Sequence, residues 1–219
     1  MLIDQEYIRI YTQLFDQALS EQKQGYFDES ALPSYLHRNK LASNLFWSRI
    51  RFALSMAEHL PGAKVLDFGC GGGITFLYLK KLNCSVTACE KEFYQLAEHV
   101  NVTLDTGVTI KTDLFAINEQ FDYIFALDVL EHIDRLDIYL DKLIELCSSQ
   151  AKIIISGPTE NWLYKIGRKI SGFSGHYHVR NIYDIEDVMK SRGLTMLNLK
   201  RLYFPFTLFR ISVWTVGPD

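Results

Sequence analysis

The stretch VLDFGCGGG, residues 65–73, decides the fold of this 219-residue chain. It joins a short β-type run at 63–68 to a helical pattern at 74–82. Glycines at such a junction let the backbone turn sharply and let a ligand approach closely, and the helix that follows begins with free N–H groups. In an open α/β sheet, ligands bind beyond the carboxyl ends of the strands. The stretch therefore predicts a binding site for a small polar ligand.

The spacing of the glycines narrows the choice of ligand. A dinucleotide fingerprint, GxGxxG, counted from Gly69 needs a third glycine at position 74, where the chain has Ile74. A phosphate-binding loop needs a Lys-Ser/Thr pair, which does not follow here. Asp67, at the end of the strand, would repel a pyrophosphate and attract an ammonium group. An NAD-dependent oxidoreductase is therefore the less favoured interpretation.

Strand and helix patterns alternate along the rest of the chain. Strands are predicted at 85–89, 108–111, 121–127 and 151–156, with helices between them at 93–100 and 136–147. This alternation indicates βαβ units and a parallel sheet. A helix at 182–191 and two β runs, 194–202 and 208–216, follow, and the β runs are expected to form an antiparallel pair at the sheet edge. Two helices, 3–19 and 40–59, precede the first strand.

Two further carboxylates end the next two strands. Glu90 follows the strand at 85–89 and can accept hydrogen bonds from both hydroxyls of a ribose. Asp113 follows the strand at 108–111 and is placed to accept from an adenine amine. Together with Asp67, these side chains form a set that suits an adenosine joined to an amino acid.

These residues, with Asp113-Leu114 and the run FDYIFALDVLEHI at 121–133, resemble the class I S-adenosylmethionine-dependent methyltransferases over about 65–156. The Leu-Glu-His element resembles the small-molecule branch that includes quinone O-methyltransferases. The resemblance implies a Rossmann-like α/β fold, with a seven-stranded, mostly parallel sheet, an antiparallel last strand and helices on both faces. It further implies one structural domain, with a helical lid at 1–60, a methyltransferase domain at 61–219 and a substrate-covering insertion at 157–181.

The resemblance also implies the cofactor, S-adenosylmethionine, which leaves as S-adenosylhomocysteine. The residues expected to bind it are Asp67, Gly69, Cys70, Gly71, Gly73, Glu90, Lys91, Asp113, Leu114, Leu127 and Asp128. Cys70 is expected to be a small filler in the turn and no nucleophile. A non-catalytic module that only binds the cofactor is the second interpretation.

Methyl transfer to oxygen needs alignment and a base, for which histidine is suited near neutral pH. His132 follows the fourth strand, and His176, His178 and Tyr164 lie in the segment that covers the substrate in this family. Asp128, Glu131 and His132 also resemble an ExxEH metal site of some quinone methyltransferases, although Asp128 shortens the reach of the first ligand. His132 is therefore a base, a metal ligand or a support of the cofactor pocket, and no metal is the favoured expectation.

Charge is distributed unevenly along the chain. The net charge of −3 argues against a general nucleic-acid binder, and no Asn/Asp-Pro-Pro-Tyr element for methylating a flipped base follows the fourth strand. Residues 157–210 nevertheless hold nine basic and four acidic side chains. This segment predicts a basic cover over an acidic cofactor cleft, and so an anionic acceptor. Residues 160–178 also resemble methyltransferases linked to cell-surface glycan synthesis, so the expected acceptor is a small molecule or a lipid- or glycan-linked group, methylated at oxygen.

The location of the protein is predicted from three features. The N-terminus has no signal-peptide pattern, no apolar run is long enough to span a bilayer, and the four cysteines form no CxxC pair. The basic amphipathic run at 161–173 either packs on the domain or lies on an anionic membrane surface. We therefore expect a cytoplasmic protein, free or at the inner membrane face, whose oligomeric state the sequence leaves open.

Overall fold

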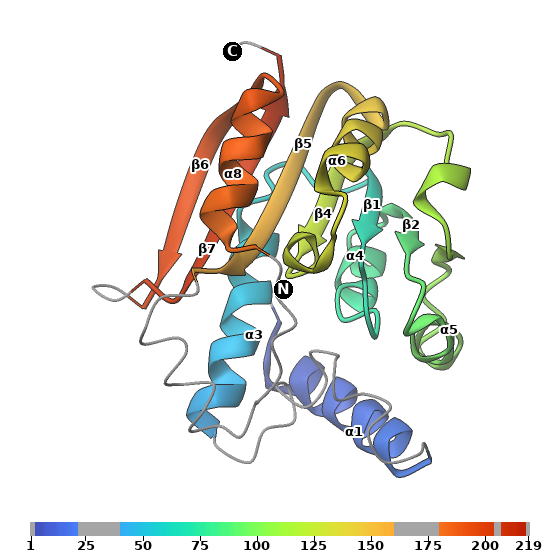
Figure 1. The fold of residues 1–219 in the computed structure, drawn as a ribbon. Helices are drawn as coiled ribbons and strands as arrows, with labels where there is room; N and C mark the ends of the chain where they lie inside the picture. The colour runs from blue at the N-terminus through green and yellow to red at the C-terminus, as the bar shows by residue number, and fades with distance from the viewer. Residues whose placement is uncertain (1–2, 22–39, 160–179, 204–206, 218–219) are drawn as a thin grey trace.

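The computed structural model describes residues 3–21, 40–159, 180–203 and 207–217 (Figure 1). Seven strands form one sheet in the order β3-β2-β1-β4-β5-β7-β6. The strands are β1 (Lys64–Phe68), β2 (Ser85–Cys89), β3 (Thr109–Lys111), β4 (Phe121–Leu127), β5 (Cys147–Pro158), β6 (Leu194–Leu202) and β7 (Phe209–Val216). Strands β1 to β5 are parallel, and β7 runs antiparallel to both β5 and β6. The predicted sheet and its antiparallel edge are confirmed.

Helices cover both faces of this sheet. They are α1 (Gln5–Glu21), α3 (Lys40–Ser55), α4 (Phe76–Lys81), α5 (Tyr94–Thr103), α6 (Leu136–Glu145) and α8 (Ile182–Ser191), with short 3-10 turns η1 (Leu114–Ala116) and η2 (Leu130–His132). Val65 and Phe125 belong to the core beneath α1, α3, α4 and α5, whereas their neighbours Leu66 and Ile124 belong to the core beneath α6 and α8. Figure 1 shows α6 and α8 together over one face. The alternation of a strand's side chains thus builds two apolar layers.

Helix α3 ends at Ser55 rather than at the predicted residue 59, and β5 begins at Cys147 rather than at the predicted residue 151. Cys147 pairs with Phe121, and the register shifts before the pair Lys152 and Tyr123. The residues in between are polar and partly exposed, so the apolar pattern could not show that they belong to a strand. Among the described residues, no helix has the length and apolar character needed to cross a bilayer.

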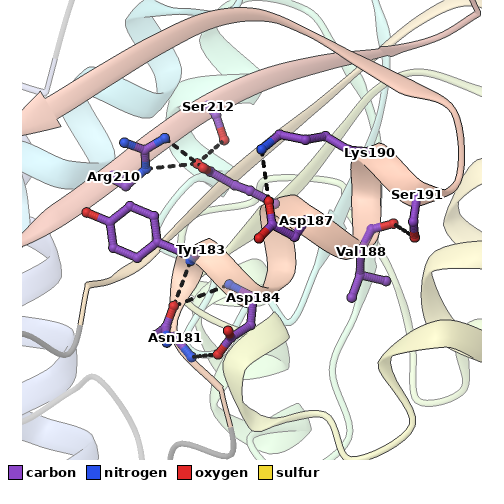
Figure 2. A network of polar contacts seen from close by, with 10 residues as sticks. Asn181, Tyr183, Asp184, Asp187, Val188, Lys190, Ser191, Arg210 and Ser212 are labelled. Atoms are coloured by element: carbon purple, nitrogen blue, oxygen red, sulfur yellow. Dashed lines mark hydrogen bonds and ion pairs between the residues drawn. The ribbon is translucent and has the colours of Figure 1, made fainter.

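A buried ion pair ties α8 to β7, as Figure 2 shows. Arg210 donates to Glu186 through two nitrogens, with Nη2 2.6 Å from Oε2 and Nε 3.1 Å from Oε1. Ser212 also donates to Oε1, and the Trp214 indole N–H donates to the Ser212 hydroxyl. Glu186 and Arg210 are both buried. A buried pair with further hydrogen bonds holds its helix in one position, because separating the charges would leave each without a partner.

Glu186→Ala is expected to lower the free energy of unfolding by about 3–5 kcal/mol, because it leaves the buried Arg210 charge unpaired. Urea unfolding followed by circular dichroism measures this loss. The control is Lys190→Ala on the same helix, which removes an exposed ion pair with Asp187 and should cost less than about 1 kcal/mol. Equal losses in the two variants would contradict a structural role for the buried pair.

Candidate active site

The turn after β1 is closely packed at every glycine except one. Gly69, Gly71 and Gly73 have positive φ angles of 70°, 54° and 67°. A Cβ atom on Gly69 would lie 2.3 Å from Cγ2 of Val129, and one on Gly73 would lie 2.5 Å from the Phe76 ring. A Cβ atom on Gly71 would meet nothing within 4 Å. The turn therefore presents bare backbone to open space at Gly71, where a ligand could approach.

Glu90 holds this turn from the neighbouring strand. Its Oε2 accepts from the Gly71 N–H at 2.9 Å, and its Oε1 accepts from the N–H groups of Glu92 at 2.9 Å and Phe93 at 3.1 Å. A carboxylate offers about four lone-pair positions, and these bonds use three of them. The predicted bonds to two ribose hydroxyls would therefore require Glu90 to share or release one backbone N–H.

Asp67 lies beneath the turn and is 3% exposed. Its Oδ2 accepts a hydrogen bond from the hydroxyl of Thr75. Burial and, to a smaller degree, the nearby charge of Glu90 raise the pKa of Asp67 to about 7, against the Thr75 hydrogen bond, which lowers it. Asp67 is thus close to half-ionised at neutral pH, and a cation bound nearby would favour its charged form.

The other predicted cofactor residues differ in their surroundings. Asp113 caps η1, since its Oδ1 accepts from the Phe115 N–H at 3.0 Å, and it is exposed. Lys91 is exposed, Leu127 is half-buried and Leu114 is buried. Cys70 is buried, and burial together with the charge of Asp67 raises the pKa of its thiol well above the usual range. That thiol stays protonated at neutral pH and is a poor nucleophile.

Arg49 is a residue that the sequence interpretation missed. It extends from α3 to the end of β4, where its Nη1 lies 2.9 Å from Oδ2 of Asp128. The Ser156 hydroxyl donates to the other oxygen of Asp128, at 3.0 Å. The Arg49 guanidinium lies over the rings of Phe46 at 4.3 Å and Phe209 at 4.2 Å. Arg49 therefore links the N-terminal helices to the edge of the sheet at which the ligand is expected.

Helical periodicity contained a signal for Arg49. Phe46 and Ala53 lie three residues before and four residues after it, so all three side chains share one side of the helix. Arg49 is itself 3% exposed. A basic residue in line with an apolar stripe indicates a buried partner, because long charged side chains are seldom fully buried without one. The sequence gives no indication that the partner is Asp128.

Asp128, the first of the proposed metal ligands, has a positive φ angle of 55°. Glu131 is buried and His132 is exposed on η2. Within the described ranges, no three His, Cys, Asp or Glu side chains form a group that could hold a metal ion. His176, His178, Tyr164 and the amphipathic run at 161–173 lie outside the described residues.

Comparison with known proteins identifies the family. The family described as "Methyltransferase domain" matches residues 35–199, which is more than half of the chain. A curated relative, the ubiquinone biosynthesis O-methyltransferase of Mesorhizobium japonicum, is 29% identical over 92 residues, which cover 39% of this chain and 37% of the relative. That of Cereibacter sphaeroides is 28% identical over 118 residues, covering 50% and 48%. The chain spans less than half the length of these curated relatives.

Solved structures share the fold at low identity. The magnesium protoporphyrin IX methyltransferase of Synechocystis PCC 6803, with bound S-adenosylhomocysteine, has a TM-score of 0.66 and 20% identity, covering 88% of this chain and 97% of that one. The same protein has also been solved with S-adenosylmethionine. The chain described here thus belongs to the methyltransferase-domain family and has the fold of class I S-adenosylmethionine-dependent methyltransferases.

Proposed function

We propose that the chain binds S-adenosylmethionine at the glycine turn and transfers its methyl group to an oxygen of a small-molecule, lipid-linked or glycan-linked acceptor. The observation that carries this proposal is the Glu90 carboxylate, bonded to the Gly71 N–H beside the open side of the turn. Asp67 and Asp113 end the two strands on either side of β2. Three carboxylates around bare backbone suit a ligand that is cationic and rich in hydroxyl groups.

The roles of the cofactor-binding residues follow from their chemistry. When bound, the cofactor supplies a methyl group activated by its sulfonium charge. Glu90 accepts from the ribose, and Asp113, whose Oδ1 caps η1, accepts from the adenine amine through its other oxygen. Asp67 supplies negative potential for the ammonium group from a buried position, where low polarity strengthens the attraction.

The remaining cofactor residues provide the surroundings of these groups. Gly69, Cys70 and Gly73 shape the turn, Leu114 and Leu127 supply apolar contact, and Lys91 lies at the exposed rim of the site. Asp128 completes the set at the end of β4, and its ion pair with Arg49 fixes its orientation.

His132 is proposed as the base that takes the proton from the acceptor hydroxyl. It is the last residue of η2, the short turn after β4, and its exposed ring can exchange the proton with solvent. The carboxylate of Asp128 is already held by Arg49 and Ser156, so a metal ion at Asp128, Glu131 and His132 would compete with an ion pair. This disfavours the metal alternative. His176, His178 and Tyr164 are proposed to face the acceptor from the covering segment.

The acceptor class is proposed from similarity and charge. The curated relatives are named as O-methyltransferases, which supports oxygen as the acceptor atom. The basic excess of residues 157–210 supports an anionic or lipid-linked acceptor and contact with the inner membrane face. Residues 1–60 are proposed to cover the site, since α3 contributes Arg49 to it.

The affinity for S-adenosylhomocysteine is expected to rise with pH. The pKa of Asp67 is about 7, so its carboxyl is mostly protonated at pH 6 and mostly ionised at pH 8. Because the ligand's ammonium group favours the ionised form, Kd should fall about tenfold across this range. Calorimetric titration measures Kd. Asp67→Asn keeps the shape of the side chain without its charge, so its Kd should not change with pH. A wild-type protein that binds no ligand at either pH refutes the proposal.

His132→Ala is expected to lower turnover about 100-fold or more, because a general base contributes that much, while Kd for S-adenosylhomocysteine changes little. Turnover is measured as product formed with a panel of phenolic and catechol acceptors. His99→Ala removes an exposed histidine from α5 and serves as the matched control. Equal losses of turnover and affinity would assign His132 to the cofactor pocket instead. Wild-type binding without turnover on any acceptor would favour the non-catalytic module.

A further inference from the structure

Helix α4, which follows the glycine turn, begins without a side-chain cap of its own. Thr75 occupies the N-cap position and makes no capping hydrogen bond, although threonine commonly accepts from the N–H groups two and three residues later. Here those groups belong to Leu77 and Tyr78. The Thr75 hydroxyl instead donates to Asp67. The start of α4 therefore needs acceptors from elsewhere.

Helix α1 supplies hydrogen-bond partners at this point. The Tyr11 oxygen accepts from the Leu77 N–H at 3.4 Å, and its O–H donates to the Gly73 carbonyl at 2.8 Å. The Tyr7 O–H donates to the carbonyl of Ile74. The two phenols thus bind both carbonyls of the turn, and Tyr11 also binds the Leu77 N–H at the start of α4.

Packing holds the two phenols in place. Tyr7 and Tyr11 lie four residues apart on one face of α1, with stacked rings whose centroids are 4.9 Å apart. The Trp47 ring of α3 contacts both rings edge-on. Tyr7 is 2% exposed and Tyr11 is fully buried. Water therefore has no access to replace either hydroxyl, and the loss of one would leave a buried backbone group without its partner.

We infer that Tyr7 and Tyr11 are positioning residues that hold the turn and the start of α4 from another helix and so keep the Thr75 hydroxyl against Asp67. Thr75 itself has helical backbone angles, φ −90° and ψ −20°, rather than the extended angles of a residue that caps a helix with its side chain. Without a phenol, a buried backbone group would lose its partner, and the start of α4 would shift and carry the Thr75 hydroxyl away from Asp67. Docking of α1 therefore determines how well Asp67 is held as a carboxylate. This inference rests on the proposed cofactor role of Asp67 for its functional consequence, because an ionised Asp67 is what attracts an ammonium group.

The charge state of Asp67 provides the measurement. The titratable groups near it are Glu90, Cys70, Tyr7 and Tyr11. The thiol and both phenols have raised pKa values and stay neutral near pH 7, so Glu90 is the charged neighbour. The Thr75 hydrogen bond lowers the pKa of Asp67. Loss of that bond must therefore move the titration of Asp67 to higher pH.

The test is a carbon-13 NMR titration of the Asp67 carboxyl in the ligand-free protein. Tyr11→Phe keeps the ring and removes the hydroxyl. The titration midpoint, which is the pH at which Asp67 is half-ionised, should therefore rise by about one pH unit, a tenfold gain in proton affinity. Tyr7→Phe should move it in the same direction. Tyr123→Phe, which removes the hydroxyl of a buried tyrosine in β4, is the matched control and should leave it unchanged. An unchanged midpoint in both Tyr7→Phe and Tyr11→Phe overturns the inference.

We call the path from the two phenols of α1 through Thr75 to Asp67 the relay. A double-mutant cycle distinguishes the relay from a general loosening of the core. Thr75→Val should raise the midpoint by itself, and Tyr11→Phe should add nothing in that background, whereas Thr75→Ser should restore the wild-type midpoint. Additive shifts overturn the inference. Should Tyr11→Phe fail to fold, Thr75→Val and Thr75→Ser still decide whether the hydroxyl holds Asp67, and Tyr7→Phe tests the contact of α1 with the turn.

A second readout connects the relay to the cofactor. At pH 7, Tyr11→Phe should weaken S-adenosylhomocysteine binding about fivefold, because a pKa raised by about one unit leaves roughly a tenth of Asp67 ionised instead of half, with no further loss when Thr75→Val is already present. A wild-type protein that binds no S-adenosylhomocysteine refutes the proposed function, whereas the ligand-free titration still decides the relay. Binding by the wild type, with an unchanged affinity in Tyr11→Phe, refutes the coupling alone.

Discussion

The turn after β1 must pass between packed side chains, and the rest of the structure depends on that constraint. Gly69 approaches Val129, Gly72 approaches Phe15 and Gly73 approaches Phe76 too closely for any side chain. Only Gly71 borders open space. Because side chains pack against the other three glycines, these neighbours determine the conformation of the turn. A ligand can approach at Gly71.

Hydrogen bonds to its backbone also hold the glycine turn in place. Glu90 holds the Gly71 N–H from β2, while the phenols of α1 hold the carbonyls of Gly73 and Ile74. The turn is thus bonded on both sides before any ligand arrives. Such preorganisation lowers the free-energy cost of ordering the site on binding.

Buried charge is balanced locally in this fold. Arg49 pairs with Asp128 at the end of β4, and Arg210 pairs with Glu186 between α8 and β7. Among the described residues, the side-chain partner of Asp67 is the Thr75 hydroxyl, which carries no charge, and burial raises the pKa of Asp67. A buried acid without a cationic partner is costly to ionise, so Asp67 is the position at which a cationic ligand would supply the missing charge.

Local patterns in the sequence determined the sheet, its antiparallel edge pair and the glycine turn, because strand periodicity and glycine spacing act over a few residues. They also identified Glu90 and Asp113 as acids at neighbouring strand ends. The start of β5 was missed, because its first residues are polar and are recruited by pairing with β4. The tertiary structure alone decided that Arg49 meets Asp128 and that Tyr7 and Tyr11 reach the turn. The two tyrosines lie 67 and 62 residues from the carbonyls that they bind, and helical spacing gives the face of a helix but not the group that this face will meet.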